Sequence, residues 1–392
     1  MRFPATSFGM LTRSRRRRLS LTPQTSTGAT TVSRLPSALL SLPDEMLDII
    51  LSASLCATLQ AAAVSCKKLS RIGSEVATRA FPATRARLSE ATPTPAEIAR
   101  PIASLVEWER AAAMQRLRLT GSSLADATLG EHLDADTDPR LRFLQRWPDL
   151  SGYGHHTQSN GADELPGPIL LDGPPVASAP AAGADGIRIV HFGMQQLPAG
   201  SLLIPFATPV APPYTAMIIA AAQGDCTLLN FGTTPTAQVE LCHGFVNEEH
   251  SLGPRVCLST NYGNSSDSSE TVNRFYGTSR SNGHWRAYTA VFDNTDAPSA
   301  ISVDGDQEGQ GSLEGRVPPI DGLILGADSE YEYPLAGAVA EVHFFEGRLP
   351  TPVSERLMAE LTEHAAQLNA VTGPVPAHLD DLLDGEAEGE EH

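Results

Sequence analysis

Apolar residues recur at helical spacing between residues 39 and 82. The first stripe follows Pro43, which suits the opening position of a helix because its missing N–H is not needed there. The apolar positions of the two stripes are Met46, Leu47, Ile50, Leu51, Leu59, Ala62, Ala63, Cys66 and Leu69. This period predicts two short amphipathic helices. A helix pair of this size leaves apolar surface uncovered, so we expect it to contact a partner or the rest of the chain.

From about residue 140 to residue 349 the period becomes that of β-strands. Short β-branched or aromatic runs alternate with Gly, Pro, Asn and Asp, and the clearest are residues 187–192, 226–231, 238–242, 284–292 and 339–345. No helical pattern alternates with them, which favours an antiparallel sandwich over a parallel sheet. Asp304 and Gly305 predict a hairpin turn, and a last amphipathic helix is predicted after Pro352.

These patterns divide the chain into five parts. We expect a disordered basic segment at 1–38, the helical module at 39–82, a linker at 83–139 with a short helix near 102–119, the β-sandwich at 140–370 and an acidic disordered tail at 371–392. The expected fold class is mainly β, with a small α-helical module on its N-terminal side.

Composition narrows the classes of function. The net charge of −18 argues against nucleic-acid binding by the folded part, because phosphate backbones are bound by clustered cations. The sequence has no apolar run of the roughly 18 residues that a membrane-spanning helix needs, so we expect no membrane partner. The five cysteines fit no even disulfide framework and no C-x-x-C metal spacing, so we expect reduced, buried thiols in a reducing compartment.

The N-terminal segment is strongly basic. Seven arginines and no Asp, Glu or Lys precede Asp44, and four of the arginines are consecutive at 15–18. This composition is typical of a nuclear-localisation or docking run, of an organelle transit peptide, or of a disordered tail without a targeting signal. The expected location is cytoplasmic, nuclear or both, with the transit peptide left open.

The helical module resembles an F-box. The resemblance is carried by LPDEML at 42–47 and AVSCKKL at 63–69, and it covers about residues 39–80. It implies that the module binds a Skp-type adaptor and, through it, a cullin ubiquitin ligase. The residues that match the docking surface of the family are Leu42, Pro43, Met46, Leu47, Ile50, Leu59, Val64 and Cys66. The alternative is a helical hairpin that packs on its own chain.

The β region resembles the concanavalin A-like, laminin-G-type sandwich. WPDLSG at 147–152, GHHTQ at 154–158, DGIRIVHF at 185–192, VDG at 303–305 and LAGAVAEV at 335–342 occur in the order of that family. The resemblance spans about residues 140–368 and implies a jelly-roll sandwich that binds a carbohydrate or a protein. Some such domains hold Ca²⁺ in their loops, for which Asp293, Asp296, Asp304 and Asp306 are the candidates.

Glycosidases share this fold class, so paired carboxylates require attention. Asp328, Glu330 and Glu332 alternate, yet the segment contains Ser329 and ends at Pro334, which is typical of an acidic loop. We therefore expect no enzyme. The expected function is a substrate adaptor of a ubiquitin ligase, whose sandwich binds a protein or glycan-bearing target. The alternative is a lectin-like binding module without a ubiquitin role, and a glycoside hydrolase is the third possibility.

Overall fold

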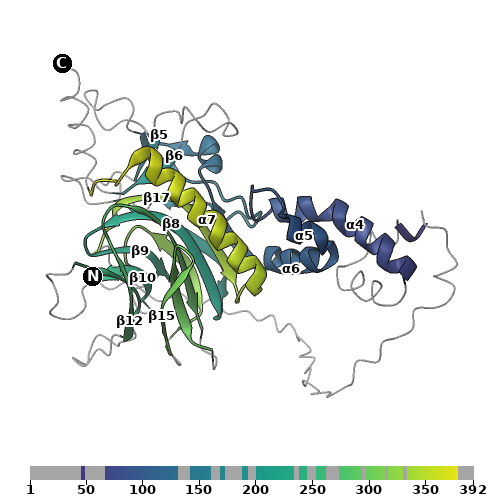
Figure 1. Cartoon of the computed structure of the whole chain (residues 1–392). Helices are drawn as coiled ribbons and strands as arrows, with labels where there is room; N and C mark the ends of the chain where they lie inside the picture. The colour runs from purple at the N-terminus through teal and green to yellow at the C-terminus, as the bar shows by residue number, and fades with distance from the viewer. Residues whose placement is uncertain are drawn as a thin grey trace, which may run out of the picture.

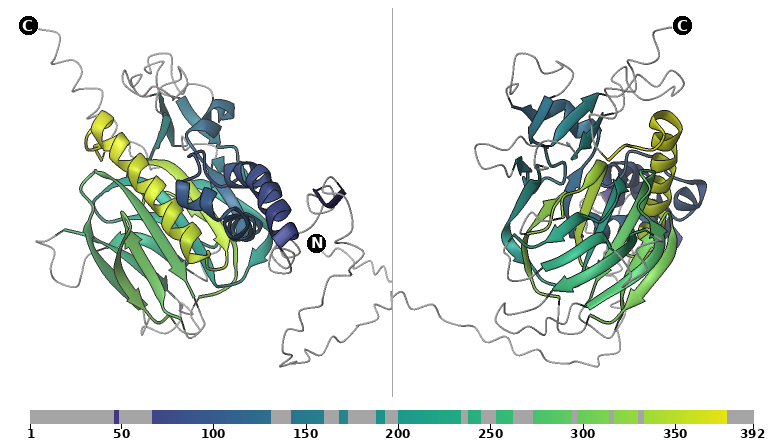
Figure 2. Two further views of the ribbon diagram at one scale, coloured as in Figure 1. Left: turned by 45° about the vertical axis from the view of Figure 1, so that its right-hand side comes forward. Right: turned by 90° about the vertical axis from the view of Figure 1, so that its left-hand side faces the viewer.

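The computed structural model shows two β-sheets packed face to face, with helices on the outer side of the larger sheet (Figures 1 and 2). The residues that it describes are 46–48, 67–130, 142–159, 168–172, 188–192, 200–233, 238–244, 253–261, 273–293, 297–313, 317–329 and 333–377. The predicted fold class, a mainly β antiparallel sandwich, is confirmed.

The larger sheet has ten strands among the described residues, and its strand pairs are antiparallel. In sheet order they are β15 (Asp306–Gly311), β14 (Ser299–Val303), β13 (Trp285–Phe292), β8 (Tyr214–Gln223), β17 (Ala336–Glu346), β6 (Arg188–His191), β5 (Ile169–Asp172), β3 (Arg142–Arg146) and β2 (Thr128–Leu129), with β1 (Gln115–Leu119) paired to β17.

The smaller sheet has seven strands. In order they are β12 (Asn273–Arg280), β11 (Arg255–Asn261), β10 (Gln238–Gly244), β9 (Cys226–Phe231), β16 (Ile320–Leu325), β7 (Leu202–Val210) and β4 (Gln158–Ser159). The sheets also meet along one edge, where Glu308 of β15 accepts hydrogen bonds from the backbone N–H groups of Thr278 and Ser279 in β12.

Strand β8 shows why the sandwich has two cores. Alternate residues of a strand point to opposite faces, and here both faces are apolar. Ala216 and Ile218 belong to the core between the two sheets, whereas Met217 and Ile219 belong to a second core on the outer side. The strand is therefore buried throughout most of its length, as its continuous apolar sequence requires.

The helices form the other wall of the second core. They are α4 (Lys67–Ala86), α6 (Pro101–Met114) and α7 (Thr351–Thr372), whereas the short helix α5 (Pro95–Ala99) has no buried residue. Ile72 and Phe81 of α4, Trp108 of α6 and Leu361 of α7 pack with the outward side chains of the larger sheet. Figure 1 shows α7 lying across that sheet, with α6 and α4 beside it.

Several predicted elements are confirmed and two need correction. The five predicted strand runs overlap β6, β9, β10, β13 and β17, and the 304–305 turn joins β14 to β15 with φ values of 51° and 92°. The short helix predicted to Leu119 ends at Met114, because the following residues form β1 against β17. The segment 83–139 is thus not only a linker, since it contributes strands to the sandwich that we expected to begin at 140.

In the part of the chain that the structure describes, no helix is both long enough and apolar enough to cross a membrane.

Candidate functional site

The outer face of the smaller sheet carries two rows of polar side chains. Val239 and Leu241 of β10 point into the core between the sheets, so Glu240 and Cys242 point away from it. Strand register extends each of these two positions into a row across β9, β10, β11 and β12. The Glu240 row is Asn230, Glu240, Ser259 and Arg274, and the Cys242 row is Thr227, Cys242, Cys257 and Tyr276.

Exposure changes along both rows. Asn230 and Ser259 are buried and Glu240 is 8% exposed, whereas Arg274 at the β12 end is exposed and Tyr276 is half-buried. Because β12 ends the path of the sheet, the rows become accessible at this edge. The helices that cover the larger sheet do not pack on this face among the described residues.

Glu240 is the unusual titrating group of the rows. Burial raises its pKa to about 7, the charge of Asp328 adds to the rise, and the guanidinium of Arg274 acts in the opposite direction. With a pKa near neutral pH, both the protonated and the ionised form of this carboxyl are populated, and a nearby charge or a change in burial shifts the balance between them. It can therefore donate or accept a hydrogen bond toward a ligand.

Arg274 and Asn230 provide the other polar groups of the Glu240 row. The Nε of Arg274 donates to the Ser259 hydroxyl at 3.1 Å. The amide nitrogen of Asn230 donates to the Gly232 carbonyl at 2.8 Å, while its oxygen is buried with no hydrogen-bond partner in the described structure. A buried acceptor without a donor is costly, and a buried water is the ordinary partner of such an oxygen.

The predicted adaptor-binding residues are described at two positions only. Met46 is 50% exposed, whereas Leu47 is fully buried in the core under the helices, and Asp48 forms an ion pair with Arg79 of α4. The other predicted positions lie outside the described residues; they are Leu42, Pro43, Ile50, Leu59, Val64 and Cys66. The F-box interpretation stays a prediction.

The segment at 147–158 forms a hydrogen-bonded loop beside β1. The Asp149 carboxylate accepts from the backbone N–H groups of Arg118, Ser151 and His155 at 3.0, 2.8 and 3.0 Å. The indole of Trp147 donates to the Thr120 carbonyl at 3.1 Å and is fully buried. These contacts give the motif a structural role.

The acidic loop and the calcium candidates are also partly described. Asp328 is buried near Glu240, while Glu330 and Glu332 lie outside the described residues. Asp293 pairs with Arg348 at 2.6 Å and Asp304 with Arg286 at 3.0 Å; Asp306 is exposed and Asp296 is not described. Among the described side chains, no group of three or more His, Cys, Asp or Glu is placed to hold a metal ion.

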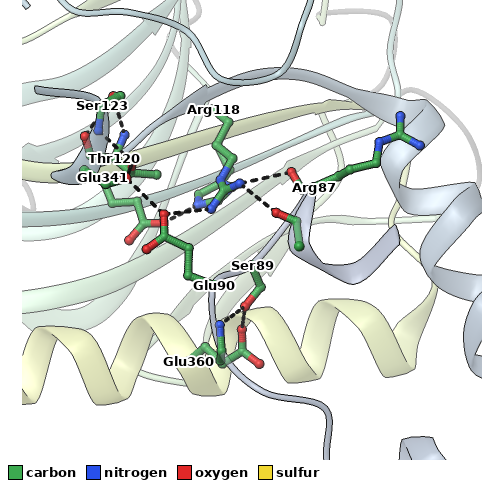
Figure 3. A network of polar contacts seen from close by, with 12 residues as sticks. Arg87, Ser89, Glu90, Arg118, Thr120, Ser123, Glu341 and Glu360 are labelled. Carbon is green, nitrogen blue, oxygen red and sulfur yellow. Dashed lines mark hydrogen bonds and ion pairs between the residues drawn. The ribbon is translucent and has the colours of Figure 1, made fainter. Parts of the chain in front are cut away.

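A second polar cluster joins the helices to the sandwich (Figure 3). Arg118 of β1 donates to the carbonyl groups of Ala86 and Arg87 at the end of α4, both at 3.2 Å, and pairs with Glu90 at 3.4 Å. Glu360 of α7 accepts from Ser89 and pairs with Arg85. Arg85, Ser89 and Arg118 are buried between elements of one chain, whereas Glu90 is exposed, and every contact joins one element of the fold to another, so we assign the cluster to packing rather than to ligand binding.

The comparisons with known proteins give structural likenesses only. No family model and no curated protein matches this chain. One similar structure is domain 4 of an extracellular arabinanase from Geobacillus stearothermophilus, in complex with arabinotriose. Its sequence is 13% identical to this chain and its TM-score is 0.37. The match covers 55% of this chain and 91% of the arabinanase domain. The receptor-binding domain of botulinum neurotoxin type G is 10% identical, with a TM-score of 0.37. That match covers 64% of this chain and 51% of the neurotoxin domain.

A Trypanosoma rangeli sialidase in complex with sialic acid is 12% identical, with a TM-score of 0.37. That match covers 76% of this chain and 40% of the sialidase chain. This chain therefore spans about half or less of the neurotoxin and sialidase structures. Neither a family nor a ligand follows from likenesses at these scores.

Sequence reasoning identified β10 as a strand but not the two polar rows. The alternation of Val239 and Leu241 with Glu240 and Cys242 was the available signal. Asn230 and Arg274 could not be added from it, because their places beside Glu240 and Ser259 depend on the register of β9 and β12.

Proposed function

We propose that this chain is a binding protein whose sandwich recognises a glycan, or a glycan-bearing target, at the β12 edge of the outer face of the smaller sheet. The observation that carries the proposal is the exposed end of the two rows, where the guanidinium of Arg274 and the half-buried ring of Tyr276 lie two positions apart on the same side of β12. Glu240 is 8% exposed and Ser259 is buried, so these two residues support Arg274 from below rather than contact a ligand.

The exposed end of the rows supports entry from β12. Arg274 provides charge-assisted donors, and the half-buried ring of Tyr276 offers an apolar surface with a polar tip. Sugars present both kinds of surface, because hydroxyl groups surround a ring whose C–H groups stack on aromatic faces. The opposite sheet offers no comparable face among the described residues, since helices cover much of its outer side.

A glycan array with the full chain tests the proposal. We expect a defined set of glycans to bind, and Arg274→Ala and Tyr276→Ala each to weaken binding about tenfold or more. Arg110→Ala on α6 and Tyr153→Ala in the loop after Trp147 are the matched controls, because both residues are exposed and lie outside the rows. Absence of glycan binding by the unaltered chain, or equal losses in the controls, would refute the assignment.

The same assay separates binding from hydrolysis. We propose binding without turnover, so a bound oligosaccharide incubated with the chain is expected to stay intact by chromatography. The closeness of the Glu240 and Asp328 carboxyl groups makes the measurement worthwhile, because glycosidases act through a pair of carboxyl groups. Product formation that disappears in Glu240→Gln would replace the binding role with an enzymatic one.

A second proposal concerns the helical module. The exposed side chain of Met46, two positions before Asp48, whose carboxylate pairs with Arg79 of α4, favours docking of residues 39–80 on a Skp-type adaptor of a cullin ubiquitin ligase. Co-purification of the full chain with such an adaptor tests it. We expect Met46→Asp to abolish the complex and Ile98→Asp, at another exposed apolar residue, to leave it intact. Failure of the unaltered chain to bind the adaptor would overturn the proposal.

A further inference from the structure

Cys242 and Cys257 lie directly opposite each other on neighbouring antiparallel strands. They are register partners in β10 and β11, and their Sγ atoms are 3.1 Å apart. Directly opposed residues of an antiparallel pair have Cα atoms about 4.5 to 5.5 Å apart, within the range of about 4.4 to 6.8 Å that a disulfide needs. The sulfur atoms must approach by roughly 1 Å to reach the bond length of about 2.05 Å.

The third described cysteine is separated from this pair by the sheet itself. Cys226 is the register partner of His243 and belongs to the core between the two sheets, whereas Cys242 and Cys257 point to the outer face. A bond from Cys226 to either of the other two would have to pass through the sheet. Among the described cysteines, strand register therefore permits a single pairing.

We propose that Cys242 and Cys257 are a cross-strand redox pair, which forms a disulfide by exchange with a small disulfide such as oxidised glutathione. Two thiols lose two protons and two electrons as the Sγ–Sγ bond forms. The disulfide bond of glutathione breaks and takes up both, which yields two molecules of reduced glutathione. The pair lies within the Cys242 row, between Thr227 and Tyr276, so oxidation changes the middle of this row without changing its two end residues.

Burial decides when the exchange takes place. Cys257 is fully buried and Cys242 is 5% exposed, so a glutathione sulfur cannot reach either atom while β10 and β11 are fully covered. The reaction therefore belongs to folding or to local opening of these strands. β10 is paired with β9 and β11, and β11 is paired with β10 and β12, so such an opening separates at least one of these strand pairs.

Peptide mapping of the unaltered full chain is the direct test. The chain is refolded in a buffer of oxidised and reduced glutathione, its remaining thiols are alkylated under denaturing conditions, and the digest is analysed by mass spectrometry without reduction. We expect one linked pair of peptides that contains Cys242 and Cys257, with Cys226 alkylated. Recovery of both residues in alkylated form, or linked to other cysteines, would overturn the proposal.

Thermal unfolding supplies an independent measurement. A disulfide closing a loop of this size, with partners 15 positions apart, is expected to raise the Tm of the oxidised chain by roughly 5 to 10 °C over the reduced chain. Cys226→Ser should keep this difference, whereas Cys242→Ser and Cys257→Ser should abolish it. The peptide mapping uses the unaltered chain. It can therefore refute the proposal even if a serine variant fails to fold.

Discussion

Arg85 of α4 and Glu360 of α7 form an ion pair although they lie 275 positions apart in the sequence. The guanidinium is almost completely buried, stacks over the ring of Trp108 at 4.8 Å and lies 3.7 Å from Glu97. The pair therefore fastens the N-terminal helices to the last helix of the chain.

Loss of the Arg85 guanidinium should destabilise the whole domain. Arg85→Met takes the guanidinium from both Glu97 and Glu360, of which Glu360 keeps Arg356 at 2.7 Å. Breaking a buried ion pair in this way is strongly destabilising, and we expect a cost of about 3 kcal/mol in the free energy of unfolding by urea. Arg71→Met is the control, because Arg71 and Glu75 form an exposed pair on the same helix at 2.9 Å. The control should change stability by less than about 0.5 kcal/mol. Equal effects of both substitutions would contradict this account.

Glu341 should make stability depend on pH in the acid range. Burial acts to raise its pKa, but hydrogen bonds with His343 at 2.7 Å and His364 at 3.2 Å outweigh burial and hold the pKa well below its usual range. A carboxyl with a depressed pKa stabilises the folded state above the unfolded value of about 4.3, and this contribution is lost as pH falls below it.

Comparison with Glu341→Gln measures that contribution. The advantage of the unaltered chain in unfolding free energy should be largest near pH 6 and shrink steadily between about pH 5 and pH 3. Glu355→Gln, at an exposed position of α7, should give a constant difference over the same range. A constant difference for Glu341→Gln would show that the carboxylate is not held by the two histidines.

Glu240 should act in a different pH window and with the opposite sign. Its folded pKa of about 7 lies above the unfolded value of about 4.3, so the unfolded chain releases its proton first as pH rises. Stability is then lost between about pH 4.5 and pH 7. Glu240→Gln removes this loss, so the variant should gain on the unaltered chain by an amount on the order of 2 kcal/mol from pH 5 to pH 8. Urea unfolding at the two pH values measures the gain, and no change would contradict the buried carboxyl.

Two glycine substitutions should have opposite effects. Gly305 has a φ of 92° in the turn after β14, so Gly305→Ala forces a side chain into the left-handed region and should cost about 1 to 2 kcal/mol. Gly73 lies within α4 without a positive φ, and an added methyl would meet Ile102 at 3.6 Å. Gly73→Ala should therefore stabilise the chain by about 0.5 to 1 kcal/mol in thermal unfolding. A loss of stability at Gly73 would mean that the contact with Ile102 is too tight.

The sequence alone determined the local elements of this protein. Residues 226–231 and 238–242 were recognisable as strands from their composition, and the 304–305 turn from the tolerance of glycine for positive φ. The last helix was recognisable from its apolar stripe, of which Val353, Leu357 and Leu361 are buried. Each of these features depends on residues within a few positions of one another, so the local sequence is sufficient to predict it.

Only the tertiary structure decided which distant residues meet. Glu240 faces Asn230 and Ser259 because of strand register, and a slip of one residue would send all of β10 to the opposite face. The near-neutral pKa of Glu240, the facing sulfurs of Cys242 and Cys257, and the ion pair of Arg85 with Glu360 all follow from such long-range placement. Burial and the distance between charges set these properties, and neither quantity is encoded in the local pattern of the chain.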